Sequence, residues 1–201
     1  MERPDQPRPL VLASTSPRRR ELLSEQGYEF EVVSPPFEEP SEQKAHVPAR
    51  HFAESLAFFK AGAIAEKLPH KTILGADTIA FIEGRIIGKP RDREDAHRIL
   101  KLLSDTTHEV ITGVALIHAE SERRLIEFDV SVIRVRKLSK ANIDAYLDTG
   151  LWQGKAGAYG IQDKNDPFVE KIEGSLSNVM GLPMELLQRM FTTWTAKARK
   201  R

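Results

Sequence analysis

The segment that most constrains the fold is a short apolar run that leads straight into a helix start. Leu10 to Ala13 is uniformly apolar, and Ser16 followed by Pro17 is typical of an N-cap and a first helical residue. Three arginines, 18–20, then fall in the first turn of a helix that we expect to stop at Gly27. Cations there oppose the helix dipole by about 0.3 to 1 kcal/mol each. The pattern is favourable if an anion such as a phosphate binds at this turn, and a solvated basic face is the alternative.

The composition is that of one globular domain. The chain has 201 residues, 40% hydrophobic and 29% charged, with a formal net charge of +1. This length can bury a single core, and a charge so near zero argues against an extended nucleic-acid surface. The absence of cysteine excludes disulfides and thiolate chemistry, and no apolar stretch approaches the roughly 20 residues of a membrane span. We expect a cytoplasmic protein with a flexible leader at 1–9, one catalytic domain at 10–194 and a basic tail at 195–201.

Hydrophobic periodicity predicts alternating strands and helices along the rest of the chain. Besides 10–13, strands are predicted at 29–34, 72–82, 85–88, 110–117, 125–135 and 168–172. Further helices are predicted at 48–68, 92–103, 139–150 and 184–194. The nearly continuous apolar run at 110–117 indicates a central strand, whereas alternation at 125–135 indicates one wet face. The sequence therefore predicts an α/β fold with a mixed sheet.

One lysine lies within the apolar face predicted for the helix at 48–68. Phe52, Leu56, Phe59 and Ala63 recur there at helical spacing. At about 100° per residue, Lys60 falls on the same face. Its ammonium must extend to solvent or meet an anion, and extension is the commoner outcome for a lone lysine.

Two further charges and a glycine-rich segment suggest a site. Asp77 follows Gly75 in an apolar strand, where a carboxylate is costly unless it is paired, hydrogen-bonded or metal-bound. Lys89 ends the second strand of a predicted hairpin, and the segment 154–162 carries glycines where the backbone must turn sharply or approach a ligand. Hydrolysis of a phosphoanhydride requires cations, carboxylates for a divalent metal and a base. Each residue alone has a structural explanation, but together they offer all three requirements.

Six blocks of the sequence resemble the Maf family of nucleoside triphosphate pyrophosphatases. They are Leu12–Arg19, Gly75–Thr78, Gly88–Pro90, Thr112–Leu116, Lys155–Gln162 and Gly181–Pro183. The resemblance implies an inosine-triphosphatase-like α/β fold, in which a mixed twisted sheet is flanked by helices and a cleft lies between two lobes, usually in a homodimer. It also implies that water attacks the α-phosphorus of a nucleoside triphosphate, with Mg²⁺ or Mn²⁺, and releases the nucleoside monophosphate and pyrophosphate.

The resemblance further implies roles for single residues. It implies that a set of polar and cationic residues surrounds the phosphates, namely Ser14, Arg18, Arg19, Lys60 and Lys89. Asp77 is implied as the proton acceptor, so Asp77, Lys60 and Lys89 are the expected catalytic residues. The implied metal ligands are Glu39 and Asp77, although the neighbouring Glu38 could equally be the family acid.

Three positions indicate which base is preferred. Arg18, Thr78 and Gln162 match family members that are selective for dTTP and UTP, and not those that act on 7-methyl-GTP. An amide and a hydroxyl can pair with a pyrimidine edge. The alternative is a nucleotide-binding regulator of septum formation without significant turnover. A nucleic-acid module built on 18–20 is disfavoured because no aromatic residues alternate with these arginines.

Overall fold

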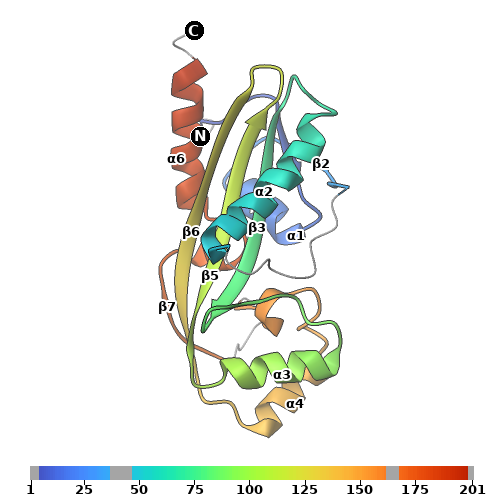
Figure 1. Ribbon diagram of the computed structural model, residues 1–201, viewed down its shortest axis with the longest axis vertical. Coiled ribbons are helices and arrows are strands. Elements are labelled where there is room, and N and C mark those ends of the chain that lie inside the picture. The colour runs from blue at the N-terminus through green and yellow to red at the C-terminus, as the bar shows by residue number, and fades with distance from the viewer. Residues whose placement is uncertain (1–4, 37–46, 162–167, 199–201) are drawn as a thin grey trace.

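The computed structural model describes residues 5–36, 47–161 and 168–198, and within these ranges a seven-stranded mixed sheet forms the centre (Figure 1). Its strands are β1 (Leu10–Ala13), β2 (Glu31–Val33), β3 (Thr72–Ile82), β4 (Arg85–Ile87), β5 (Thr107–His118), β6 (Arg123–Val135) and β7 (Val169–Glu173). They are ordered β2-β1-β3-β5-β6-β7, with β4 beside β3. β1 is parallel to β2 and β3, and the other pairs are antiparallel. The predicted fold class is confirmed.

Helices cover both faces of the sheet. They are α1 (Pro17–Glu25), α2 (Ala49–Ala65), α3 (Arg93–Leu103), α4 (Lys140–Asp148), α5 (Leu176–Val179) and α6 (Met184–Ala198), with a 3-10 turn, η1 (Ala156–Ala158). Because side chains alternate along a strand, β1 buries Leu10 and Leu12 against α1 and α6, and Val11 and Ala13 against α2. In Figure 1, α3 and α4 form a second lobe at one end of the long strands. Its core includes Ile133 near the end of β6.

Several predicted elements match the structure closely. The strand predicted at 72–82 is β3 without a change of bounds. The helix predicted after Ser16 is α1, and it is followed by Gly27 with a φ of 73°. The predicted hairpin turn at Glu83 and Gly84 has positive φ at both residues, which joins β3 to β4 with the twist that a two-residue hairpin needs.

The apolar stripe predicted for α2 is buried in part. Ala53, Ala57 and Ile64, which widen the predicted stripe, are buried, whereas Phe59 within it is 53% exposed. The sheet beneath the helix explains the difference, because a Cβ on Gly113 would lie 2.3 Å from the carbonyl oxygen of Ala53. A Cβ on the glycine at position 75 would be equally close to the α2 backbone. The helix therefore rests directly on β3 and β5 through small residues, and a phenylalanine does not fit between them.

The solvent exposure of β6 also differs from the predicted single exposed face, because it changes along the strand. Phe128 and Val130 are half-buried beside α2, but Ser131, Ile133 and Val135 on the opposite face are fully buried. The strand runs past α2 and into the second lobe, where its other face is covered. A single alternation of apolar and polar residues therefore could not describe β6 both beside α2 and in the second lobe.

The described part of the N-terminal segment packs against the domain. Gln6 is buried, and its amide group donates to the carbonyl oxygen of Glu29 at 2.7 Å and accepts from its backbone N–H at 2.9 Å. The carbonyl of Pro9 accepts from the N–H of Thr72. Residues 5–9 are therefore held in place rather than loose. At the other end, α6 extends into the predicted tail as far as Ala198.

Candidate active site

The site begins at an opening in the edge of the sheet. β1 ends at Ala13, opposite Gly75 of β3, and β4 pairs with β3 only from Ala80 onwards. Between these pairings, residues 76–79 have no neighbouring strand on that edge within the described part of the chain. Ligands of open α/β sheets bind beyond the carboxyl ends of parallel strands. A cavity of about 620 Å³ lies at this position.

The cavity wall contains most of the residues singled out in the sequence. They are Ser14, Arg18, Arg19, Lys60, Asp77, Thr78 and Lys89. They come from the turn after β1, the first turn of α1, α2, β3 and the segment after β4. Glu38, Glu39 and Gln162 lie outside the described residues, so their positions stay predictions. Segments far apart in the sequence therefore converge on one cavity. Among the seven wall residues named above, the cationic side chains outnumber the one acidic side chain.

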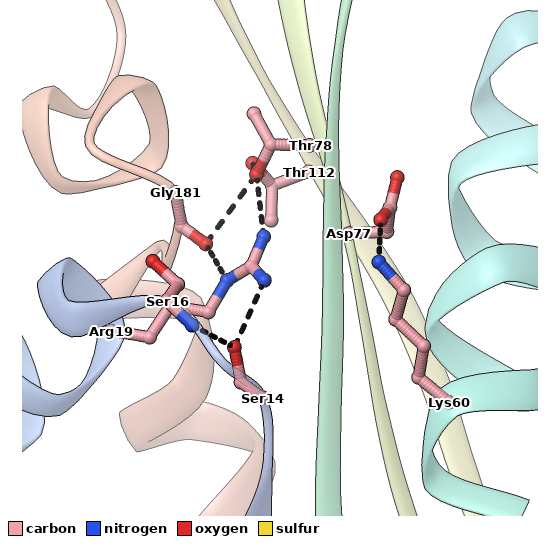
Figure 2. Close-up of polar contacts among 8 residues, drawn as sticks. All are labelled: Ser14, Ser16, Arg19, Lys60, Asp77, Thr78, Thr112 and Gly181. Carbon is pink, nitrogen blue, oxygen red and sulfur yellow. Dashed lines mark hydrogen bonds and ion pairs between the residues drawn. The ribbon is translucent and has the colours of Figure 1, made fainter. Parts of the chain in front are cut away.

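The Arg19 guanidinium, from the first turn of α1, forms hydrogen bonds with three different residues (Figure 2). Its Nε donates to the carbonyl oxygen of Gly181 at 2.8 Å, its Nη1 to Ser14 Oγ at 3.3 Å and its Nη2 to Thr78 Oγ1 at 3.2 Å. Ser14 Oγ also accepts the backbone N–H of Ser16 at 3.1 Å, which completes the turn into the helix. A guanidinium held in this way has lost much of its freedom before a ligand binds.

Asp77 and Lys60 form a buried ion pair on the other side of β3. Lys60 Nζ donates to Asp77 Oδ1, and the two side chains are 10% and 6% exposed. Consecutive strand residues point to opposite faces, and Figure 2 shows Asp77 and Thr78 on the two sides of the strand. Both line the same cavity. A ligand at the open edge therefore meets the Arg19 cluster on one side of β3 and the carboxylate on the other.

The commoner outcome expected for Lys60, extension to solvent, is wrong. The structure shows the other outcome, in which the ammonium meets an anion, and that anion is Asp77. The reason is the close approach of α2 to the sheet at Gly75 and Gly113. Each residue explains the burial of the other, because a buried charge is tolerated when it is paired.

One residue that lines the cavity, His108, was not singled out in the sequence, whereas its partner Tyr159 lies in the glycine-rich segment at 154–162. His108 of β5 is 2% exposed, and its Nε2 lies 2.9 Å from the hydroxyl of Tyr159. Burial lowers the pKa of His108 to about 4, so the imidazole is neutral at physiological pH. No pattern marked His108, because its partner lies 51 residues away.

Lys155 also lines the cavity, and it lies in the glycine-rich segment that the sequence did mark. A Cβ on Gly160 would lie 2.6 Å from Lys155 Nζ, so the absence of a side chain at 160 leaves room for the lysine. The sharp turns expected in this segment occur at Gly154 and Gly157, whose φ values are 71° and 76°, while the group close to Gly160 is this lysine and not a ligand. The cavity thus has a further cation beyond those predicted.

The donors at the cavity fit a divalent cation that is shared with a polyphosphate. Mg²⁺ is usually bound through one or two carboxylates, with substrate phosphates and water as the other ligands. Asp77 supplies one carboxylate in the wall. No group of three or more His, Cys, Asp or Glu side chains that could hold a metal occurs among the described residues. The structure therefore fits a metal that needs substrate oxygens, and not a site built from the described side chains alone.

None of the helices in the described ranges is long and apolar enough to cross a membrane.

Comparison with known proteins identifies the family. The model of the family described as Maf-like protein matches residues 9–194. A protein of Elusimicrobium minutum named dTTP/UTP pyrophosphatase is 41% identical over 181 residues, which cover 90% of this chain and 96% of that protein. One of the same name from Thermoanaerobacter pseudethanolicus is 43% identical over 187 residues, covering 90% of this chain and 96% of that protein.

A solved structure supports the fold. The HAM1 protein of Coxiella burnetii is 18% identical, with a TM-score of 0.50 over 92% of this chain and 98% of that one. At this identity the likeness shows the fold alone. The match to the family model and to relatives over nine-tenths of the chain shows more: this chain belongs to the Maf-like protein family.

Proposed function

We propose that the protein hydrolyses nucleoside triphosphates, dTTP and UTP above all, to the nucleoside monophosphate and pyrophosphate. The observation that carries the proposal is that one cavity is lined both by arginines at the start of α1 and by the buried carboxylate of Asp77. The names of the relatives, dTTP/UTP pyrophosphatase, agree with that chemistry. A phosphoanhydride substrate requires both kinds of group.

The cations would bind the triphosphate. Arg19 offers a guanidinium that is already oriented, next to Ser14 and the start of α1, where Ser16 makes no side-chain cap hydrogen bond. Arg18 and Lys89, which line the same cavity, would neutralise further phosphate oxygens. Pre-oriented cations stabilise the charge that develops in the transition state without having to reorganise at the moment of reaction.

Asp77 would accept the proton of the attacking water. It is the acid that the described cavity wall contributes beside the cations, and Lys60 holds one of its oxygens. A divalent cation, Mg²⁺ or Mn²⁺, would supply charge neutralisation at the phosphates when bound. Asp77 would be one of its ligands and Glu39 another, although Glu39 lies outside the described residues. Lys60 would orient the carboxylate through its hydrogen bond to Oδ1.

Selectivity for the base would come from Arg18, Thr78 and Gln162. Thr78 lies beside Arg19, at the boundary between β3 and the turn after α5. Gln162 lies outside the described residues, and if its amide pairs with a pyrimidine, a base that leaves the amide unpaired would bind less well. We also propose that the protein is cytoplasmic, in keeping with its lack of cysteine.

A homodimer is a further part of the proposal. α2 presents Phe59 at 53% exposure, and Val32 of β2 is 43% exposed. Exposed large apolar side chains are common in contacts between subunits. Sedimentation of the wild-type protein and of Phe59→Ser measures the oligomeric state. A wild-type protein that stays monomeric at micromolar concentration would contradict this part alone.

A panel of nucleotides tests the proposed function. Purified protein is incubated with Mg²⁺ and each of dTTP, UTP, CTP, ATP and GTP, and pyrophosphate release is measured. We expect kcat/KM for dTTP and UTP to exceed that for ATP and GTP by at least about tenfold, the scale of one buried hydrogen bond to a base. Equal use of all five nucleotides would contradict the selectivity. Binding without any turnover would favour the regulatory alternative.

A further inference from the structure

We propose that Thr112, which lies outside the cavity, is a positioning residue that orients Arg19 through a closed ring of hydrogen bonds. The inference rests on the proposed function, because it assigns Arg19 to the phosphates of the substrate. Thr112 belongs to β5 and is fully buried, as is Asn178 of α5. Neither residue lines the cavity. Any effect of Thr112 on the reaction must therefore pass through the residues that it contacts.

Five residues close the ring. Arg19 Nη2 donates to Thr78 Oγ1 at 3.2 Å, and Thr78 Oγ1 lies 2.9 Å from Thr112 Oγ1. Thr112 Oγ1 donates to the carbonyl oxygen of Asn178 at 3.2 Å. The N–H of Gly181 donates to the same oxygen at 2.9 Å, and the carbonyl oxygen of Gly181 accepts from Arg19 Nε at 2.8 Å. Figure 2 shows the part of the ring around Arg19.

The proton positions give the ring a direction. A guanidinium only donates and a carbonyl only accepts, while each threonine hydroxyl has one proton. The Asn178 carbonyl accepts a hydrogen bond from the Thr112 hydroxyl. The oxygen of Thr112 can therefore accept a hydrogen bond from the Thr78 hydroxyl. The oxygen of Thr78 then presents its lone pairs to Arg19. Arg19 can only donate, so Thr78 Oγ1 is its acceptor in any case, and the Thr112 hydroxyl orients Thr78 by giving the Thr78 proton an acceptor on the side away from Arg19.

The anchor of the ring is rigid. The side-chain amide of Asn178 donates to the carbonyl oxygen of Val110 at 3.0 Å and to Ser131 Oγ at 2.9 Å. Its backbone N–H donates to Ser175 Oγ at 3.2 Å. These bonds tie α5 to β5 and β6, so the carbonyl that receives Thr112 has a fixed place in the core. Through Thr112, the centre of the sheet sets the orientation of a guanidinium at the cavity.

The ring also shows what a change at Thr78 would affect first. Its hydroxyl is already engaged by Arg19 and Thr112. A change at Thr78 therefore changes the orientation of Arg19 first. Because Gly181 O lies 3.4 Å from Thr78 Oγ1 and already accepts from Arg19, it is a weak substitute for Thr112 as the acceptor of the Thr78 proton.

The test is a double-mutant cycle with dTTP as substrate. Thr112→Val keeps the side-chain shape and removes the hydroxyl, and Thr112→Ser keeps the hydroxyl. Thr106→Val is the matched control, since it removes a hydroxyl that donates to the carbonyl of Leu103 away from the cavity. We expect Thr112→Val to lower kcat/KM by about 3- to 10-fold, and Thr112→Ser and Thr106→Val to stay within about twofold of wild type.

The cycle is completed by placing Thr112→Val in an Arg19→Met background. If Thr112 acts through Arg19, the second substitution adds less than about twofold, and each single variant changes the same parameter, kcat or KM. Losses that multiply in the double variant, or a Thr112→Val variant with wild-type kinetics, would overturn the inference. Either result with an active wild-type protein leaves the proposed function intact. An inactive wild-type protein would instead contradict the proposed function itself.

Discussion

The ammonium of Lys60 on α2 forms an ion pair with the carboxylate of Asp77 on β3, inside the contact between helix and sheet. The pair exists because Gly75 and Gly113 let the backbone of α2 rest on the strands. It presents a paired carboxylate to a cavity whose other charged side chains, among the described residues, are arginines and lysines. The packing of α2 and the chemistry at the site are therefore coupled.

The first prediction concerns the carboxylate itself. Asp77→Asn keeps the side-chain shape but removes the base and the metal ligand. We expect turnover of dTTP to fall by at least about 10²-fold, with a circular dichroism spectrum like that of the wild type. A folded variant with near-normal turnover would exclude Asp77 as the proton acceptor.

The second prediction concerns the ion pair and stability. Lys60→Met leaves the Asp77 carboxylate buried without this partner, so we expect the free energy of unfolding at pH 7 to fall by about 3 kcal/mol. The double variant Lys60→Met/Asp77→Asn removes both charges and should recover most of that loss. Urea denaturation measures the free energy of unfolding of the wild type, Lys60→Met and the double variant. If the double variant is no more stable than Lys60→Met alone, the pair is not what stabilises this contact.

The third prediction concerns the close approach of α2. Gly113→Ala would place a Cβ 2.3 Å from the carbonyl oxygen of Ala53, so the helix must shift. We expect a loss of about 3 kcal/mol or more in the free energy of unfolding, and a loss of turnover because Lys60 moves with the helix. Gly62→Ala is the control, since nothing lies within 4 Å of its Cβ. It should be neutral or gain up to about 1 kcal/mol. Equal stability of the two variants would contradict the packing argument.

The fourth prediction concerns pH. Burial lowers the pKa of His108 to about 4, below the roughly 6.5 expected in the unfolded chain. Between these values the unfolded chain binds the proton and the folded one does not, so folding stability falls as pH drops from about 6.5 to about 4, by about 3 kcal/mol in total. His108→Gln, which can keep a bond to Tyr159, should show a flatter stability profile over this window. Identical slopes for both proteins would show that His108 is not the titrating group.

Much of the fold could be predicted because its signals are local. The bounds of β3 and the N-terminus of α1 follow from apolar runs and from Ser16-Pro17. The buried face of α3 follows from its periodicity, as Ala96 and Ile99 show. The exposure of Phe59 on α2 could not be predicted in the same way, because the size of the side chains that fit beneath this helix depends on glycines of two distant strands.

Residues that line the cavity could be singled out in the sequence, but their contacts could not. Three arginines at a helix start predicted an anion site, and the structure brings Arg18 and Arg19 to the cavity. That Arg19 would be held by Gly181, 162 residues away, had no local signal. His108 was missed for the same reason, and Thr112, although it begins one of the six matching blocks, was given no role. Buried polar residues acquire their roles only from the partners that the fold provides.

The central claim is that water attacks the α-phosphorus of a nucleoside triphosphate in this cavity. Its most direct test is hydrolysis of dTTP with Mg²⁺ in ¹⁸O-labelled water, with the products analysed by ³¹P NMR and mass spectrometry. The account predicts dTMP and pyrophosphate in equal amounts, the label in dTMP alone, and no products above background from Asp77→Asn. Formation of dTDP and inorganic phosphate, or label in the pyrophosphate, would contradict it.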